Sequence, residues 1–270
     1  GNILESIRRK AVKVYYNDRG FQLGNLLYLL LQAHKDCLDG IAESYVLRTG
    51  YYAFAQTFFP KTAELFSKAN GIELEEFGYF QISGEDYLPV HVDSFVARYL
   101  QEPIQQLSRE FEEKDITIAI RRTDFIQKDR YKHYGYDMMQ YVEDCLERIA
   151  ELEAENFQTM TIRITSDDVY WCREELVPAL KEKYSFIFPI VVEEQDIRDN
   201  FVQLFNCKKY FISANSTYCY WVGYVLRMAK PEVQVFAPNF NTMLIEEGRQ
   251  IADARNWLLI DVNRENNGEF

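Results

Sequence analysis

Residues Ile116–Asp124 read Ile-Thr-Ile-Ala-Ile-Arg-Arg-Thr-Asp, an apolar β-branched run that passes directly into a charged cluster. Such a run is typical of a buried strand. After residue 114 the chain repeats this pattern. Strands are expected at 160–165, 186–192, 210–213 and 233–237, and helices at 136–152, 169–183, 200–205 and 216–228. Strands that alternate with helices predict a parallel sheet in an α/β fold.

The first part of the chain has a less regular pattern. Residues Ala11–Tyr16 alternate as a strand does, and Leu23–Leu38 form a mostly apolar helix after a loop. Helical spacing continues from Val92 to Phe111, with a break or kink expected at Pro103. The sequence therefore predicts two α/β halves, residues 1–113 and 114–270, with a cleft between them.

Composition excludes several classes of protein. The 270 residues include 30 Lys and Arg against 42 Asp and Glu, a formal charge of −12, so nucleic acid is not expected as the main partner. The five cysteines are odd in number and form no C-x-x-C, which favours free thiols in a reducing compartment. The three histidines lack the spacing of metal ligands, and no apolar run reaches the ~20 residues that span a bilayer.

Polar clusters follow several of the expected strands, at the edge where parallel sheets bind ligands. Arg121 and Arg122 come first, and their guanidinium groups suit bidentate binding of phosphate while Asp124 orients one of them. A solvated charge cluster would explain the same residues. Ser166, Asp167 and Asp168 follow the next strand. These acids either cap a helix or accept hydrogen bonds from a base or ribose.

A third cluster, Asn215-Ser216-Thr217, stands where a helix begins after the strand at 210–213. Helix N-termini attract anions, although a simple Ser/Thr cap is the competing interpretation. The loop Asp18–Asn25 carries glycines but matches neither G-x-G-x-x-G nor a P-loop. No G-x-S-x-G and no D-x-D occurs. A bound diphosphate would therefore be neutralised by arginine and a helix dipole.

Together these clusters resemble glycosyltransferase family 11, the α-1,2-fucosyltransferases, and share features with the wider fucosyltransferase superfamily. Residues 21–28 match an L-G-N core, 119–125 match H-x-R-R-G-D-Y, 166–172 match S-D-D-x-x-W-C, and 214–221 match A-N-S-T-x-x-x-W. Phe236-Ala237-Pro238 and Trp257 resemble the family's tail. The departures are Ala119 for the motif histidine, Thr123 for its glycine and Leu26 for a glutamine.

The resemblance implies a GT-B-like pair of Rossmann-type halves, with 1–113 on the acceptor side and 114–270 binding the sugar nucleotide. It implies inverting transfer of L-fucose from GDP-fucose to a galactose-containing glycan. The missing D-x-D and the paired arginines at 121 and 122 predict that no metal is needed, and no further cofactor is expected. The expected catalytic residues are Arg121, Arg122, Asp124 and Asp18. The expected donor-binding residues are Gly24, Asn25, Ser166, Asp167, Asp168, Asn215, Ser216 and Thr217.

Two rival functions remain open at this point. One is a glycosyltransferase that uses another nucleotide-deoxyhexose, and the other is a non-catalytic sugar-nucleotide or glycan-binding homologue, which Ala119 suggests. A dehydrogenase is disfavoured by the missing glycine fingerprint. The expected location is cytoplasmic, or the Golgi lumen if an N-terminal anchor was trimmed. A lipid-linked acceptor would add weak membrane association.

Overall fold

The computed structural model describes residues 12–17, 21–48, 51–67, 74–80 and 84–265. The chain forms two compact units, Gly1–Pro103 (unit 1) and Ile104–Phe270 (unit 2). Each unit contains a parallel sheet, so the predicted α/β class with two parallel-sheet halves is confirmed. The cleft expected between the halves stays a prediction.

The division between the units falls ten residues before the boundary expected after residue 113 (113 − 103 = 10). The reason lies in α6, Gln101–Ser108, and the turn that follows it. The side-chain nitrogen of Asn206 donates to the carbonyls of Ser108 at 3.2 Å and Phe111 at 2.6 Å. These bonds attach the segment before the first strand of unit 2 to that unit.

Unit 1 has a sheet of three parallel strands in the order β2-β1-β3. The strands are β1 (Val12–Tyr16), β2 (Glu43–Val46) and β3 (Leu74–Glu76), and the helical elements are α2 (Leu23–Leu38), α3 (Tyr52–Phe58), η1 (Pro60–Leu65), η2 (Gly84–Asp86) and α5 (Pro89–Phe95). Buried Asp36 of α2 accepts hydrogen bonds from Tyr15 at 2.5 Å and Ser44 at 3.0 Å. These bonds join the helix to both neighbouring strands.

Two helices contain a wide π-turn just before a proline. Residues Val96–Leu100 (η3) precede Pro103 within α6, and Cys172–Leu176 (η5) precede Pro178 within α10 (Val177–Lys183). A proline has no N–H to bond the carbonyl four residues back, and a π-turn absorbs that mismatch. The kink expected at Pro103 therefore appears as a π-turn one turn earlier.

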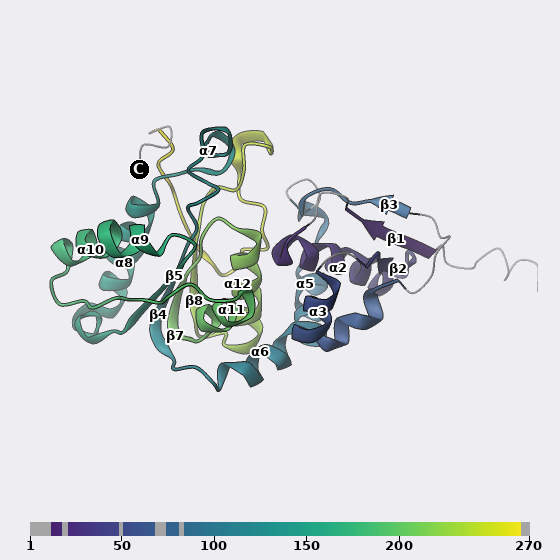
Figure 1. The fold of residues 1–270 in the computed structure, drawn as a ribbon, viewed down its shortest axis with the longest axis horizontal. Helices are drawn as coiled ribbons and strands as arrows, with labels where there is room; N and C mark the ends of the chain where they lie inside the picture. Colours follow the sequence, from purple (N-terminus) through teal and green to yellow (C-terminus); the bar gives the residue numbers. More distant parts are fainter. Residues whose placement is uncertain (1–11, 18–20, 49–50, 68–73, 81–83, 266–270) are drawn as a thin grey trace, which may run out of the picture. The chain divides into compact units, whose positions relative to one another are not determined.

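Unit 2 contains six parallel strands in the order β6-β5-β4-β7-β8-β9 (Figure 1). They are β4 (Lys114–Ile120), β5 (Ile162–Ser166), β6 (Ile190–Val191), β7 (Cys207–Ile212), β8 (Gln234–Pro238) and β9 (Leu258–Ile260). The strand predicted over 186–192 shrinks to β6, because Pro189 has no N–H to donate to a ladder and Phe188 is exposed. The short strands β2, β3 and β9 were not expected from the sequence.

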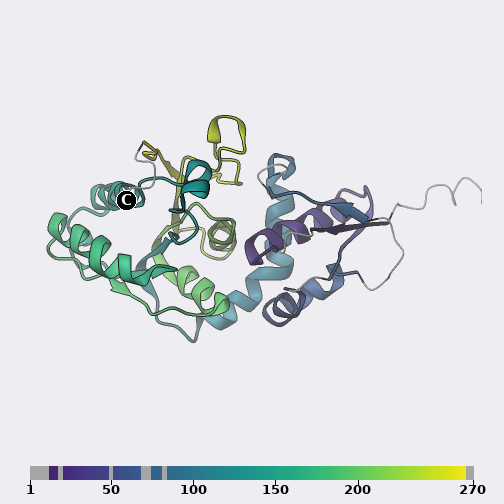
Figure 2. The same cartoon turned by 45° about the horizontal axis from the view of Figure 1, so that its top comes forward.

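Helix α7 (Lys128–Tyr134) follows the charged cluster after β4 and was also not expected. In Figures 1 and 2 it lies beside the yellow-green connection between β8 and β9, which includes the short helical turn η6 (Glu246–Gly248). The backbone N–H of Met243 donates to the carbonyl of His133 at 3.0 Å. Arg264 donates to the carbonyls of Gly135 at 2.8 Å and Lys132 at 2.9 Å, so the chain end also holds α7.

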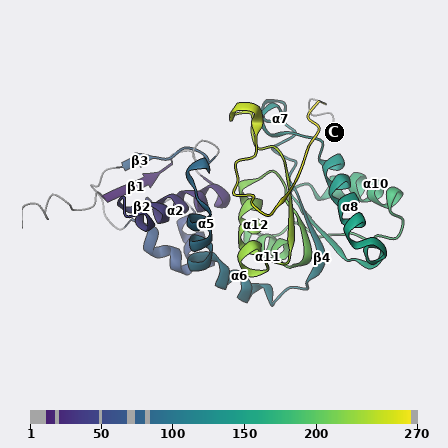
Figure 3. The ribbon, with the colours of Figure 1, turned by 180° about the vertical axis from the view of Figure 1, so that it is seen from behind.

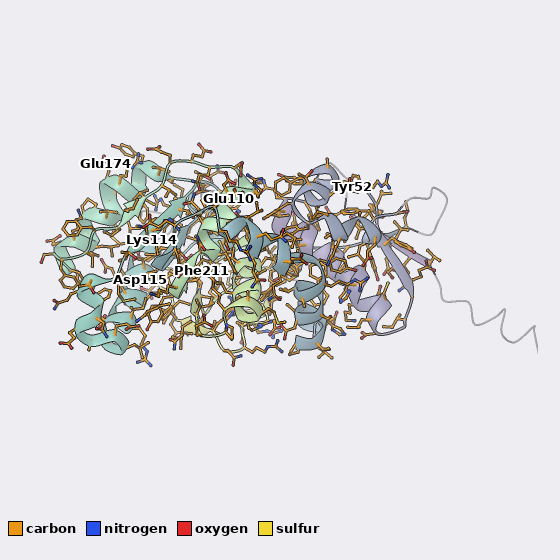
Figure 4. All side chains as sticks on the ribbon, turned by 90° about the horizontal axis from the view of Figure 1, so that it is seen from below. Tyr52, Glu110, Lys114, Asp115, Glu174 and Phe211 are labelled. Atoms are coloured by element: carbon orange, nitrogen blue, oxygen red, sulfur yellow. The ribbon has the colours of Figure 1, made fainter. Side chains whose placement is uncertain are left out.

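Helices cover both faces of the six-stranded sheet (Figure 3). One face carries α8 (Met138–Glu153), η4 (Ala154–Thr159), α9 (Val169–Trp171) and α10, and the other carries α11 (Ile197–Phe205) and α12 (Thr217–Ala229). The core lies between these layers and includes Ile116 and Ile118 of β4, which are fully buried. Figure 4 labels Lys114 in β4 and Phe211 in β7, two strands that pair in parallel. Within the described residues, no helix combines the length and apolarity that crossing a bilayer requires.

Candidate active site

The site lies where the strand order of unit 2 reverses direction. From β4 the chain continues to β5 and β6 on one side, whereas β7, β8 and β9 extend on the other. In such sheets the loops after the two central strands diverge, and ligands bind in the crevice outside their carboxyl ends. Parallel pairing sets Ile118 of β4 beside Ile212 of β7, so the clusters at 121–124 and 213–217 share this edge.

The two arginines that follow β4 have different environments. Arg122 is buried, its Nε donates to Asp168 Oδ2 at 3.3 Å, and its guanidinium carbon lies 4.1 Å from the centre of the Trp171 ring. Arg121 is partly exposed and donates to Asp124 Oδ2 at 3.1 Å. Part of the Arg121 guanidinium is therefore open to solvent, whereas Arg122 lies against Asp168 and Trp171. The contact that each arginine is expected to make with a donor phosphate stays a prediction.

Asp124 holds two cations at once. Besides Arg121 it pairs with Arg130 of α7, whose Nη1 lies 3.2 Å from Asp124 Oδ2. The two guanidinium groups fix the direction in which the carboxylate points. This arrangement suits the orienting role that the sequence indicates for Asp124.

The acids after β5 are bound to the loop after β4. Asp167 accepts from the N–H of Arg122 at 2.9 Å and from the N–H and hydroxyl of Thr123 at 3.3 Å and 2.7 Å. Asp168 caps α9 by accepting from the Trp171 N–H at 3.0 Å, and the Ser166 hydroxyl accepts from the Asp168 N–H at 2.8 Å. Both acids thus position residues 121–124, which we call the arginine loop. A contact of either acid with a base or ribose stays a prediction.

The turn from β7 into α12 is rigidly held. The Tyr141 hydroxyl donates to the Ser213 carbonyl at 2.7 Å, and the N–H of Asn215 donates to the Tyr136 hydroxyl at 3.3 Å. Burial raises the pKa of both tyrosines, so their hydroxyls stay protonated at neutral pH. The backbone at the start of α12 is therefore fixed before any ligand arrives.

Ser216 is the N-cap of the 13-residue helix α12, but its hydroxyl caps nothing. Its side chain is 6% exposed, and its Oγ has no hydrogen-bond partner in the part of the chain that the structure describes. A buried hydroxyl without a partner is costly, and a helix N-terminus favours anions. Thr217 occupies the first helical position beside it.

The charge of Arg121 reaches the first turn of α12. Burial raises the pKa of the Cys219 thiol to about 11, and the positive charge of Arg121 opposes this rise. The charge of Arg121 is therefore felt at the first turn of α12. A guanidinium, a helix N-terminus and a free hydroxyl together can neutralise and bind an anionic group.

The candidate residues of unit 1 are described only in part. Gly24 and Asn25 lie in the first turn of α2, where Asn25 Oδ1 is buried without a hydrogen-bond partner among the described residues. Asp18 lies outside the described residues. The predicted roles of Gly24, Asn25 and Asp18 stay predictions.

Two of the departures from the family motif, Ala119 and Thr123, can be explained by their surroundings. Ala119 is buried in β4 and pairs with Thr165 of β5, so the position of the motif histidine lies inside the sheet. Thr123 uses its hydroxyl on Asp167, which a glycine could not do. Trp257 packs on α12 at Gly223, where an added Cβ would lie 2.5 Å from the tryptophan ring.

His34 and His91 are hydrogen-bonded to other side chains of unit 1, and the cysteines form no disulfides. His34 shares a 2.8 Å hydrogen bond with Ser94, and His91 shares one of 2.8 Å with Asp39. All five cysteines lie in the described part of the chain and are free thiols, as the sequence predicts. Among the described residues, no three or more His, Cys, Asp or Glu side chains gather as metal ligands would.

The sequence did not indicate several residues that support the site through hydrogen bonds and ion pairs. Arg130, Tyr136 and Tyr141 carry no motif, and their partners are distant in the sequence. Trp171 was visible as part of a motif, but its stacking on Arg122 was not. The tyrosines could have been suspected only from their position at the start of the expected helix at 136–152.

Comparison with known proteins gives a family match and distant structural matches. The search of curated proteins gave no match. Among solved structures, POFUT1 in complex with GDP matches at 13% identity and a TM-score of 0.40 over 70% of this chain and 59% of that chain. A second POFUT1 structure with GDP matches at 12% and 0.47 over 84% and 97%. Escherichia coli heptosyltransferase WaaC with ADP-2-deoxy-2-fluoro heptose matches at 9% and 0.44 over 92% of both chains.

These distant structures add nothing to the assignment, which depends on the sequence family. The profile described as Glycosyl transferase family 11 matches residues 57–261, most of the chain. The matched segment contains the arginine loop, the acids after β5 and the start of α12. The chain belongs to glycosyl transferase family 11, a family of fucosyltransferases.

Proposed function

We propose that this fucosyltransferase moves L-fucose from GDP-fucose to a hydroxyl of a galactose-containing glycan, forming an α-1,2 linkage with inversion at the anomeric carbon. The observation that carries the proposal is that partly exposed Arg121 and the start of α12, with the buried Ser216 hydroxyl, lie at the same edge of the sheet. This edge is the switch point of the sheet, where we expect the nucleoside diphosphate to bind between the diverging loops.

The donor diphosphate takes its counter-charge from the protein. Arg121 supplies a planar fork, α12 supplies backbone N–H groups and partial positive charge, and Ser216 supplies one more donor. The nucleoside end then extends toward the loop after β5, where Ser166, Asp167 and Asp168 lie. No divalent metal is needed for this arrangement, since the diphosphate is already neutralised.

The reaction displaces GDP from the sugar. The acceptor oxygen forms a bond to the anomeric carbon, the bond from that carbon to the β-phosphate oxygen breaks, and its electron pair leaves with GDP. Negative charge grows on the leaving diphosphate, so donors that strengthen at this moment lower the barrier. The proton of the acceptor hydroxyl passes to a base.

Asp18 is the base that we propose. Asp124, the other candidate, already holds Arg121 and Arg130 and is better suited to orienting the arginine. Replacement of Asp18 by Asn should lower kcat while GDP binding stays intact. Equal loss of kcat and GDP affinity would instead indicate a structural role for Asp18.

A donor screen that follows nucleotide release, with and without a panel of galactosides, tests the proposed function. GDP-fucose should release GDP, and a galactoside should accelerate the release. Faster turnover with another GDP- or dTDP-deoxyhexose would favour the rival donor. Binding of GDP with no turnover on any acceptor would favour a non-catalytic homologue, which buried Ala119 in place of the motif histidine also suggests.

We also propose a cytoplasmic location, because five free thiols suit a reducing compartment. If the acceptor is lipid-linked, the enzyme would bind membranes weakly through that acceptor. Sedimentation of the protein with vesicles, with and without a galactosyl lipid, separates this from direct membrane binding.

A further inference from the structure

Gln250 is the centre of a polar network in the connection between β8 and β9. Its Nε2 donates to the carbonyls of Pro238 at 2.9 Å and Phe240 at 3.2 Å. Its Oε1 accepts from Asn241 Nδ2 at 3.2 Å and from the Ala252 N–H at 3.0 Å. The Gln250 side chain thus joins the first residues of the connection to its later part.

The network extends from Gln250 to helix α12. Gln250 Nε2 also donates to the Tyr220 hydroxyl at 3.1 Å, and Tyr220 is fully buried one turn into the helix. Asn241 Nδ2 lies 3.5 Å from the same hydroxyl. The connection after β8 is therefore bonded to the helix whose N-terminus faces the proposed donor.

Asn215 is hydrogen-bonded to two members of this network, Asn241 and Tyr220. Its Nδ2 donates to the Asn241 carbonyl at 2.7 Å, and its Oδ1 accepts from the Tyr220 hydroxyl. The residue is 5% exposed and directly precedes Ser216. The orientation of Asn215 fixes the backbone that leads into the N-cap.

A buried network of this kind acts as a unit. Removal of one member leaves the others without partners in a medium of low dielectric, and the remaining groups then shift to find new ones. The N–H groups that bind an anion at the start of a helix must be aimed within a few tenths of an ångström. A shift at Asn215 would move them.

We propose that Gln250 is a positioning residue for the donor diphosphate, acting through Tyr220 and Asn241 on the turn that carries Ser216. The inference rests on the proposed function and extends it to a residue that no motif contains. Gln250 does not touch the donor in this account. It holds the anion-binding turn in one conformation, so that GDP binds without first having to order it.

The test uses two substitutions and one matched control. Gln250→Leu removes every polar contact of the side chain at similar volume, and Tyr220→Phe removes a single hydroxyl. The control is Asn239→Ala, in the same connection, where an exposed side-chain amide donates to Asp261 at 2.9 Å and no bond to α12 is lost. Calorimetric titration with GDP and a melting curve are recorded for each protein.

The expected result is GDP binding about tenfold weaker in Gln250→Leu and several-fold weaker in Tyr220→Phe, with the control unchanged. Donor KM should rise while acceptor KM stays constant. Ser216→Ala should weaken GDP binding less in the Gln250→Leu background than in the natural protein, because the turn is already displaced there. If Gln250→Leu does not fold, Tyr220→Phe alone decides.

Two results overturn the inference. One is GDP affinity within about twofold of the natural protein in both variants. The other is additivity of Gln250→Leu with Ser216→Ala, which would leave Gln250 a general structural role. Failure of the natural protein to bind GDP is a different result, because it contradicts the proposed function itself.

Discussion

Asp167 accepts a hydrogen bond from the Thr123 hydroxyl at an oxygen–oxygen distance of 2.7 Å, and this bond joins the loop after β5 to the loop after β4. The same carboxylate also accepts the N–H groups of Arg122 and Thr123. The family motif has glycine at position 123, so the hydroxyl is a contact of this chain's own. The hydroxyl bond holds the arginine loop on its exposed side, whereas the contacts of buried Arg122 hold the loop on its inner side.

Loss of that hydroxyl should loosen the loop. We expect Thr123→Val to lower the free energy of unfolding by about 1 kcal/mol and to raise donor KM, while Thr123→Ser keeps both values. Urea unfolding and donor titration measure the two effects. Identical behaviour of the Val and Ser variants would show that the hydroxyl contributes nothing.

The two arginines should respond differently to substitution. Arg121→Ala should reduce kcat by ~10²–10³ with little change in Tm, because its guanidinium is partly exposed and, in the proposed reaction, contacts the leaving diphosphate as charge develops on it. Arg122→Ala should lower stability by about 2 kcal/mol, since it removes a buried charge-assisted bond to Asp168 and the stacking on Trp171. Lysine at position 121 should restore only part of kcat. Normal kcat in Arg121→Ala would remove the centre of the proposed mechanism.

Turnover should not depend on a divalent metal. The leaving diphosphate is stabilised in our account by Arg121 and the start of α12, so activity should persist in excess EDTA. Nucleotide release measured with EDTA, and then with added Mg²⁺ or Mn²⁺, checks this. Loss of turnover on chelation and its return with metal would contradict the arginine account.

GDP should stabilise the folded protein. Ligand linkage predicts about 2.7 kcal/mol at a hundredfold excess over Kd, seen as an upward shift of the melting curve. Ser216→Ala should reduce the shift at a fixed GDP concentration, because it removes the hydroxyl that has no internal partner. AMP and NAD should give little shift, and an equal shift with UDP or dTDP would contradict the guanine assignment.

Stability should fall in mild acid because of His34. Burial, with the nearby charges of Arg98 and His91 adding to it, lowers the pKa of His34 from 6.5 to about 4, although Glu64 acts in the opposite direction. Between pH 4 and pH 6.5, His34 therefore binds a proton more readily in the unfolded state than in the folded state. The stability that neutral His34 contributes to the fold is fully present above pH 6.5 and is lost as the pH falls toward 4. We expect about 2 kcal/mol less stability at pH 5 than at pH 7 from this group.

Chemical unfolding at the two pH values, compared with His34→Gln, isolates the contribution of His34. The variant should lose less stability on acidification, because a glutamine does not titrate. An equal loss in both proteins would assign the acid sensitivity to the carboxylates instead.

The local pattern of apolar residues was enough to predict the long helices and strands. The apolar face of residues 23–38 predicted helix α2 with its observed bounds, and the β-branched run at 116–120 predicted most of β4. Elements of three or four residues, such as β2, β3 and β9, carry too few side chains to show a period. They form because a neighbouring strand offers hydrogen bonds, which is information from outside the segment.

The sequence alone determined the α/β class, the order of the motifs and the membership in a glycosyltransferase family, because these depend on local periodicity and on short runs of residues. Only the tertiary structure decided which arginine is exposed and which is buried, since Asp168, the partner of Arg122, lies 46 residues away. The same holds for Gln250, whose partner Tyr220 is 30 residues distant and carries no motif. Contacts of this range arise from strand order, which brings separate loops to one edge of the sheet.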